Sequence, residues 1–355
     1  MNSRTWARAE AAVIAEASEP VLEHGCYVLG REVAMLEDRL AGYLGTRHAV
    51  GCNSGFGAHL LSLLALDIGV GSNVLVSPFS PPSFAGAVVR RNARLHFADV
   101  DEDDFHVSAS AIGDHVDGMQ LLVVHHLFGG AADMPVIRAA AGDVPIIEVL
   151  TYSFGTEVEP GRRAGTYGTV TTACLREETT LGAYGDAGMI WTDDPAVAER
   201  LRLIRKEDEY HEVYQGITAG NFHMDTLHAA ILLRKLDRWA ETARLRRERA
   251  RLIQRAVSTV DGLKVPGATQ DAATRFVILA EDREGLSRYL REYGIQAEPW
   301  WPVPLHLQPG FAGLGFAKGD FPNAESVAAR SLYLRLPDEK SVLDRVPELL
   351  SNFSA

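Results

Sequence analysis

The stretch QLLVVHHLFGGAADMPVIRAAAGDVPIIEVL (120–150) shows the pattern that decides the fold. An apolar run over 120–128 is followed by a helical pattern over 132–143 and by a second apolar run over 144–150. Short apolar runs bounded by turn residues predict buried strands. A helix between two such strands predicts a right-handed crossover within a parallel sheet. The stretch therefore favours a mostly parallel sheet covered by helices.

The same alternation extends outward in both directions. Further strands are predicted over 74–79, 93–100 and 187–194, and further helices over 55–69 and 80–92. Repeated strand–helix units of this length predict an α/β architecture with helices on both faces of the sheet.

A long helical pattern from residue 223 to about 255 follows, with a possible hinge near Trp239. Beyond it, a strand over 274–281 and helices over 285–295 and 341–353 predict a smaller α+β unit. We therefore expect a large domain over 1–240 and a small C-terminal domain over 241–355.

Composition narrows the possible partners. The chain has 355 residues, 46% hydrophobic and 23% charged, with a formal net charge of −12. An acidic chain without a basic run is a poor candidate for nucleic acid or an anionic membrane surface. Three cysteines do not make a disulfide framework, and no signal peptide or membrane span is predicted, so we expect a cytoplasmic protein.

Four segments in order resemble the DegT-type aminotransferases, which act on nucleotide-linked sugars with pyridoxal phosphate (PLP). They are LGREVAMLEDRLAGYLGTRHAVGCNSG (29–55), HLFGGAADMPVI (126–137), GNFHMDTLHAAILLRKLDRW (220–239) and WPVPLHLQPGFAGLGFAKGDFPNAE (301–325). The resemblance implies the fold-type I aminotransferase architecture, with a mostly parallel seven-stranded-type sheet. It also implies a homodimer with its active sites at the subunit interface.

The resemblance also places the cofactor residues, and several differ here. The family's Schiff-base lysine falls on Thr180, and no lysine precedes Lys206 in the whole chain. Lys206, in a charged helix end, is a remote substitute. The family's ring aspartate falls on Val149, and a valine cannot stabilise a protonated pyridine nitrogen. In the turn that the resemblance assigns to phosphate binding, Phe56 stands where the family has a residue with a hydroxyl group.

Two more positions complete this comparison. Leu175 stands where the resemblance implies a second phosphate-binding serine, whereas Asn221 matches the family's ligand from the partner subunit. Because the lysine, carboxylate and hydroxyl positions differ together, the sequence predicts that no cofactor is used. A variant dependent on pyridoxamine phosphate is an alternative, but that chemistry needs the same carboxylate and phosphate cradle.

Two interpretations of the altered pocket remain open: bulky side chains fill it, or they reshape it for another ligand. Candidate pocket residues are Phe56, Val149, Phe154, Tyr184, Asn221, Trp300 and His306. Histidines and a desolvated carboxylate near one ligand are typical of acid–base catalysis. Candidate catalytic residues are His126, Glu178, His223, Tyr152 and Thr180. The spacing of histidines and cysteines predicts no metal site.

The sequence therefore leads to the hypothesis of a PLP-independent enzyme on an aminotransferase scaffold. Its reaction would be cyclisation, elimination, isomerisation or hydrolysis of a sugar-like or natural-product intermediate, with antibiotic biosynthesis as a setting. The alternative is a catalytically silent homologue that serves as a partner subunit. A homodimer is expected in either case, with Asn221 and His223 of one subunit facing the pocket of the other.

Overall fold

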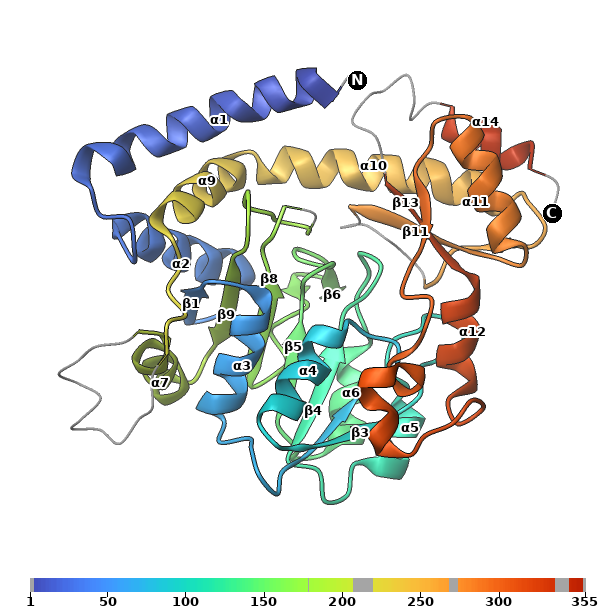
Figure 1. Ribbon diagram of the computed structural model, residues 1–355, viewed down its shortest axis with the longest axis horizontal. Coiled ribbons are helices and arrows are strands. Elements are labelled where there is room, and N and C mark those ends of the chain that lie inside the picture. The colour runs from blue at the N-terminus through green and yellow to red at the C-terminus, as the bar shows by residue number, and fades with distance from the viewer. Residues whose placement is uncertain (1–2, 178, 207–219, 268–273, 336–344, 354–355) are drawn as a thin grey trace.

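A computed structural model describes residues 3–177, 179–206, 220–267, 274–335 and 345–353. Its centre is a seven-stranded sheet in the order β1-β9-β8-β5-β4-β2-β3 (Figure 1). The strands are β1 (His48–Cys52), β2 (Asn73–Val76), β3 (Arg94–Phe97), β4 (Leu121–His125), β5 (Ile146–Val149), β8 (Val170–Cys174) and β9 (Gly188–Thr192). The predicted α/β class and the fold-type I sheet are confirmed.

The sheet is parallel except at β9. Strands β3, β2, β4, β5 and β8 pair in parallel, whereas β9 pairs antiparallel with both β8 and β1. Six strands therefore point the same way, and their carboxyl ends meet at one edge. In sheets of this kind, ligands bind outside that edge.

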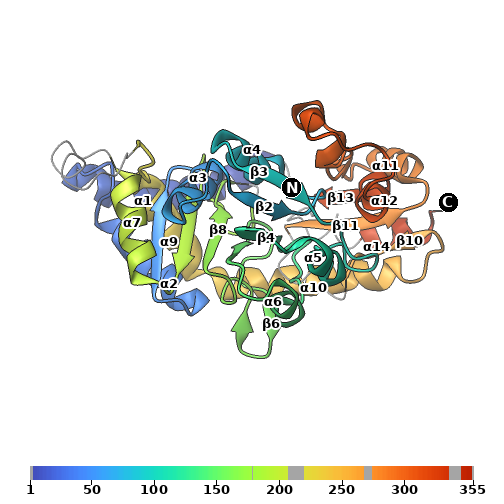
Figure 2. The same cartoon turned by 90° about the horizontal axis from the view of Figure 1, so that it is seen from below.

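Helices cover both faces because successive strand residues point to opposite sides. One face packs against α3 (Gly55–Ala65), α4 (Pro82–Arg90) and α7 (Pro195–Arg205), and its core includes Val74, Val76 and Val149. The other face carries α2 (Arg31–Leu44), α5 (Ala109–His115), α6 (Met134–Ala141) and α9 (Thr226–Asp237). The two layers are visible when the molecule is turned by 90° (Figure 2).

A pair of consecutive helices links the large sheet to the C-terminal part of the chain. Helix α9 ends at Asp237 and α10 runs over Trp239–Val257, so the predicted hinge near Trp239 is confirmed. The N-terminal helix α1 (Ser3–His24), which the sequence analysis left unassigned, lies along α9 (Figure 1). Their contact buries Ala17 and Val21 against Ala230 and Ile231.

A second sheet, in the order β10-β11-β13-β12, forms the C-terminal part. Its strands are β10 (Leu263–Lys264), β11 (Arg275–Ala280), β12 (Ala297–Pro299) and β13 (Ser331–Arg335). Helices α10, α11 (Arg283–Glu292) and α14 (Val346–Ser351) share its core, whereas the turns η1 (Leu305–Leu307) and η2 (Pro309–Leu314) and helix α12 (Pro322–Arg330) lie beside the large sheet. A boundary between 240 and 241 stays a prediction, because α10 contributes to the second sheet's core and begins beside the first.

The sequence analysis missed some strands. Strands β1 and β8 read HAVGC and VTTAC, in which small and polar residues interrupt the apolar pattern. The short hairpin of β6 (Glu157–Glu159) and β7 (Arg162–Arg163) is made entirely of half-buried or exposed residues, so it carries no apolar signal. No helix in the described part of the chain is long and apolar enough to span a lipid bilayer.

A buried carboxylate fixes the end of β5. Glu148 is fully buried and accepts hydrogen bonds from the backbone N–H groups of Gly165 (2.7 Å), Tyr167 (2.7 Å) and Gly168 (2.5 Å). The imidazole Nε2 of His126 lies 2.9 Å from the same carboxyl group. Burial raises the pKa of Glu148, but the contacts with His126 and the backbone N–H groups outweigh it and lower the pKa. The carboxylate therefore holds the loop before β8 against β5.

We predict that Glu148→Gln lowers the free energy of unfolding by about 3 kcal/mol, because breaking a buried charged network leaves its partners without compensation. Urea denaturation at pH 7 measures this. Glu292→Gln, an exposed site on α11, is the control and should change stability by less than about 0.5 kcal/mol. Equal stability of the two variants would contradict the role of Glu148.

The wild-type chain should also lose this contribution in acid. Because the folded pKa lies below the ordinary value of 4.5, the contribution is complete above about pH 4.5 and is lost as the pH falls through the folded pKa. Glu148→Gln should lose less stability than the wild type over that range.

Candidate functional site

The carboxyl edge of the sheet begins with the turn that enters α3. The Ser54 hydroxyl caps this helix by accepting from the N–H of Gly57 at 2.9 Å. The Asn53 backbone N–H donates to the carbonyl of Phe222 (3.1 Å), and the Asn53 side chain donates to the carbonyl of Asn221 (3.2 Å). The segment that contains Asn221 therefore lies against the N-terminus of α3, where unpaired N–H groups favour an anion.

Two loops of this edge meet at Thr180. Its hydroxyl donates to the carbonyl of Thr151 at 3.2 Å, and its side chain is buried. This contact joins the loop after β8 to the loop after β5. Val149, the last residue of β5, is also buried and faces the side of α3 and α4. Phe56 packs at the margin of the same core, with the Arg90 guanidinium 5.2 Å from its ring centroid.

Aromatic side chains gather at the same edge. Phe79, Phe128 and Tyr152 each lie three residues beyond the end of β2, β4 and β5, respectively. They meet Trp300 and Trp301, which follow β12. Ring centroids are 4.9 Å apart for Tyr152–Trp300, 5.3 Å for Phe79–Trp301 and 6.1 Å for Phe128–Trp300. We call these five residues the edge aromatics.

Backbone strain marks two of them. Phe128 and Trp301 have φ values of 59° and 42°, in the left-handed region that bulky residues rarely adopt. Residues held in such conformations cluster at binding and catalytic sites. Trp301 is only half-buried, whereas Trp300 is 3% exposed. The edge aromatics therefore form a packed wall with Trp301 at its accessible side.

Two candidate histidines, one expected to be catalytic and one expected to line the pocket, are held in buried contacts. His126 is fully buried: Nε2 contacts Glu148, and Nδ1 accepts the N–H of Ala132 at 3.1 Å. His306 is buried as well, and its Nε2 lies 3.1 Å from a carboxyl oxygen of Glu325. Both imidazoles hold local structure through carboxylates that are 22 and 19 residues away in sequence. Neither is placed to exchange protons with a ligand at the aromatic wall.

Other candidates lie apart from the edge aromatics. Phe154 points to the opposite side, where it stacks on Tyr43 at 5.1 Å between centroids. Tyr184 packs in the cluster formed by α1 and α9. His223 is half-buried in the segment beside α3. Glu178 lies outside the described residues.

Sequence reasoning missed a buried polar group beneath the edge. The imidazole Nδ1 of His59, on α3, lies 3.1 Å from the hydroxyl of Thr172 on β8. His125, at the end of β4, is 3% exposed and neither ring nitrogen has a hydrogen-bond partner within the described part of the chain. Burial lowers the pKa of His59 to about 3 and holds that of His125 well below 6.5. Both rings are therefore neutral near pH 7.

Lys206, the lysine that the sequence offered as a remote substitute, directly follows α7. The amine of Lys235, on α9, contacts the loop that contains Thr180. It donates to the carbonyl of Gly182 at 2.6 Å and lies 3.9 Å from the ring centroid of Tyr184. Nothing in the sequence around Lys235 indicated this contact.

The fold and the edge site together define an aminotransferase-like protein of fold type I. A sequence model of the DegT/DnrJ/EryC1/StrS aminotransferase family matches residues 9–343. The chain belongs to this family.

Known relatives resemble the chain along nearly its whole length. A pleiotropic regulatory protein of Geobacillus stearothermophilus is 32% identical over 95% of this chain and 94% of its own. A dTDP-3-amino-3,4,6-trideoxy-alpha-D-glucose transaminase of Streptomyces venezuelae is 31% identical over 92% of this chain and 89% of its own. The crystal structure of S. venezuelae DesV in complex with a ketimine intermediate has a TM-score of 0.92 at 29% identity, covering 98% of this chain and 96% of that one.

These relatives overturn the hypothesis of a PLP-independent acid–base enzyme. The transaminase aligns with 92% of this chain, and family members are sugar aminotransferases. In addition, His126 and His306 are held in buried contacts with carboxylates. Neither that hypothesis nor the interpretation as a pseudo-aminotransferase is supported.

The family implies PLP, and the residues at two positions bear on whether it fits. Thr180 offers a hydroxyl bonded to the Thr151 carbonyl, and Val149 offers only methyl groups. A hydroxyl forms no Schiff base, and an aliphatic side chain carries no charge for a ring nitrogen. The residues at these positions do not fit PLP held covalently at position 180.

We predict that His125→Leu flattens the acid side of the stability profile. An unfolded histidine gains a proton below about pH 6.5, whereas buried His125 stays neutral, so the wild type loses stability as the pH falls from 6.5 toward the folded pKa. The loss between pH 7 and pH 5 should shrink by roughly 2 kcal/mol, at 1.36 kcal/mol per pKa unit. Urea denaturation at both pH values measures it.

At pH 7 the same variant should be at least as stable as the wild type, since it removes two ring nitrogens without partners. His115→Leu, an exposed site on α5, serves as the control. An unchanged pH profile in His125→Leu would show that this imidazole titrates freely in the folded protein.

Proposed function

We propose that this chain binds a nucleotide-linked sugar at the carboxyl edge of its large sheet. The edge aromatics carry this proposal, because they line the place where sheets of this type bind ligands. Aromatic faces give apolar contact to the C–H groups of a sugar ring, and ligand sites are typically lined by such side chains. The capped N-terminus of α3 lies at the same edge and favours a negatively charged group.

The relatives support the choice of substrate class. The S. venezuelae transaminase is named for a dTDP-linked amino sugar, and it aligns with 92% of this chain. A sugar linked to a nucleoside diphosphate combines a ring that can stack with an anion. Both parts match the chemistry of the edge.

We further propose that this family member lacks the lysine and the ring carboxylate that the resemblance assigns to positions 180 and 149. Thr180 supports this because its side chain is buried and bonded within the edge. No lysine occurs among residues 1–205. A covalent link to PLP from position 180 is therefore not expected.

Assembly remains a prediction. We propose a homodimer in which the segment of Asn221 and His223 also faces the partner's edge. The segment's position against the N-terminus of α3 in its own chain supports this, because it already lies beside the proposed site.

The substrate proposal predicts that the purified protein binds dTDP-glucose in isothermal titration calorimetry. Trp301→Ala should weaken binding about tenfold, since a buried aromatic contact contributes more than 1 kcal/mol at most binding hot spots. Tyr293→Ala, an exposed aromatic on the small sheet's helix side, is the matched control and should leave affinity unchanged. No binding by the wild type, or equal affinity of the two variants, would refute the proposal.

The proposal about positions 149 and 180 predicts that absorbance from bound PLP increases only when both positions are changed. With PLP, the wild-type protein and Thr180→Lys should show little absorbance at about 420 nm. Thr180→Lys combined with Val149→Asp should show more, because the lysine can then form a bond with the cofactor and the carboxylate can hold its ring. Absorbance spectra after desalting measure this. A yellow wild-type protein would contradict the proposal without affecting the test of sugar binding.

A regulatory role is the second candidate. It is favoured by the G. stearothermophilus relative, which is named a pleiotropic regulatory protein and aligns with 95% of this chain. We infer that such a role would act through a change in the protein's assembly when a nucleotide-linked sugar binds. Light scattering with and without dTDP-glucose tests it, and an unchanged molecular mass would count against it.

A further inference from the structure

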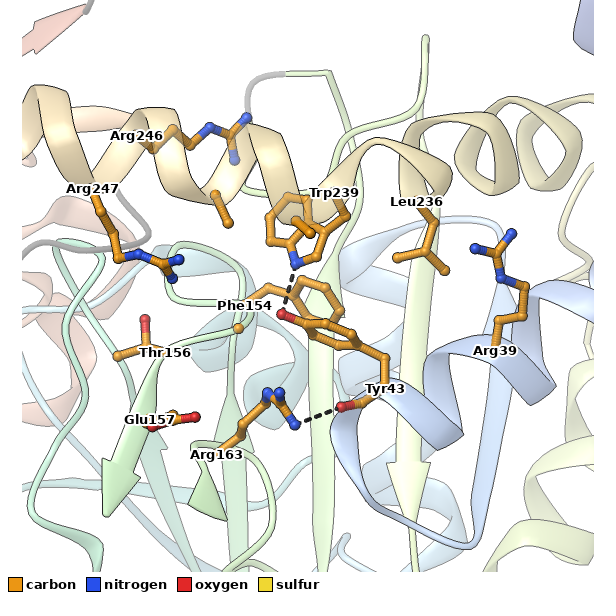
Figure 3. Close-up of a pocket in the computed structure, with 13 residues that line it drawn as sticks. Arg39, Tyr43, Phe154, Thr156, Glu157, Arg163, Leu236, Trp239, Arg246 and Arg247 are labelled. Atoms are coloured by element: carbon orange, nitrogen blue, oxygen red, sulfur yellow. Dashed lines mark hydrogen bonds between the residues drawn. The ribbon is translucent and has the colours of Figure 1, made fainter. Parts of the chain in front are cut away.

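A separate cavity of about 730 Å³ opens between α2, the β6–β7 hairpin and the α9–α10 junction (Figure 3). It is large enough for a small ligand, since such sites commonly measure about 300–1,000 Å³. Four of its residues are arginines and three are aromatic. The lining is Arg39, Tyr43, Phe154, Gly155, Thr156, Glu157, Arg163, Leu236, Trp239, Ala240, Ala243, Arg246 and Arg247.

This cavity is distinct from the edge site. The chain after β5 passes between the two. Tyr152 packs with the other edge aromatics, whereas Phe154 belongs to the cluster of Tyr43 and Trp239. Among the described residues, Val149 and Thr180 do not line the cavity. A ligand bound here would therefore lie on the other side of that segment.

The wall of the cavity is rigid. The Trp239 indole N–H donates to the Tyr43 hydroxyl at 2.7 Å, which ties α10 to α2. Arg163 donates to the Tyr43 carbonyl at 3.0 Å, and its guanidinium lies 4.7 Å from the Tyr43 ring centroid. Figure 3 shows these contacts side by side. An arginine held in this way loses little side-chain freedom when it binds an anion.

The charge in the cavity is unbalanced. Four arginines but one acidic residue, Glu157, are among the described lining residues, so guanidinium groups outnumber carboxylates in the lining. Arg39 is paired with Asp237 at 2.7 Å. Arg247, which is half-buried, has no hydrogen-bond or ion-pair partner among the described residues. Its side chain extends from α10 toward Thr156 and Glu157 (Figure 3).

We propose that this cavity binds a diphosphate group. Guanidinium groups pair with phosphate oxygens through two parallel hydrogen bonds, which are stronger than bonds between neutral groups. A lining in which guanidinium groups outnumber carboxylates suits a group that carries two to three negative charges. The low-dielectric aromatic wall strengthens the attraction by excluding water. Arg246 contacts the edge through the Thr180 carbonyl at 2.6 Å, but the proposal does not rest on sugar binding at the edge site.

The test is isothermal titration calorimetry with three probes: inorganic pyrophosphate, dTDP and inorganic phosphate. Pyrophosphate should bind the wild-type protein, and phosphate should bind more weakly. Arg247→Gln should weaken pyrophosphate binding by about tenfold or more, since a hydrogen bond to a charged group contributes about 1.5–3 kcal/mol. Arg251→Gln, an exposed site on the same helix outside the cavity, is the matched control and should bind like the wild type.

A second variant is expected to raise the affinity for pyrophosphate. Glu157→Gln removes the acidic lining residue and should tighten pyrophosphate binding severalfold. Because it shifts affinity upward, misfolding cannot produce the expected result. Trp301→Ala, which weakens the edge site, should leave pyrophosphate affinity unchanged, so the two proposals fail separately.

The dTDP arm identifies the source of the diphosphate. Provided that Arg247→Gln weakens dTDP binding as well, dTDP affinity much higher than that of pyrophosphate assigns the cavity to a nucleotide, and equal affinities assign it to the diphosphate alone; both support the proposal. Absence of pyrophosphate binding would overturn it. Equal affinities of Arg247→Gln and Arg251→Gln for pyrophosphate would also overturn it.

Discussion

The buried carboxylate of Glu148 is the contact on which the edge site depends. It binds the backbone of the loop at 165–168 and the ring of His126, so it fixes where β4 ends, where β5 ends and where β8 begins. A charge without these partners would be costly in the interior, and each partner would lose a bond without the charge. The network therefore sets the positions of the loops that follow the central strands.

Those loops place side chains on opposite sides of one segment. Beyond Val149, Tyr152 points to the edge aromatics, and two residues later Phe154 points to the arginine-lined cavity. The fixed end of β5 thus serves two surfaces at once. The carboxyl edge offers aromatic faces and a helix N-terminus, whereas the cavity offers guanidinium groups. A chain of this family can in this way present two sites of different chemistry without a change in its sheet.

Much of the fold could be predicted from local patterns, because β2, β4 and β5 are mainly apolar and lie within longer apolar runs. Strands β1 and β8 could not, because small and polar residues interrupt their apolar pattern. The resemblance singled out Thr180 and Val149, Tyr152 was a candidate catalytic residue, and in the structure all three lie at the carboxyl edge.

The roles of individual side chains were harder to predict. The partners of His126 and His306 are carboxylates that only the fold brings close. The sequence alone therefore does not show that both imidazoles are already engaged in contacts with carboxylates. The side on which Phe154 packs follows from the turn after β5, which has no simple periodicity. The cavity arginines come from α2, the hairpin and α10, so no single segment revealed them.

The central claim is that this family member keeps a sugar site at the carboxyl edge while position 180 supplies no amine. A crystal structure of the purified protein grown with PLP and a dTDP-linked amino sugar tests it most directly. The account predicts electron density for the sugar against Trp301, with no continuous density from residue 180 to the cofactor's aldehyde carbon. Continuous density from residue 180 to that carbon, or a sugar bound away from the edge aromatics, would contradict it.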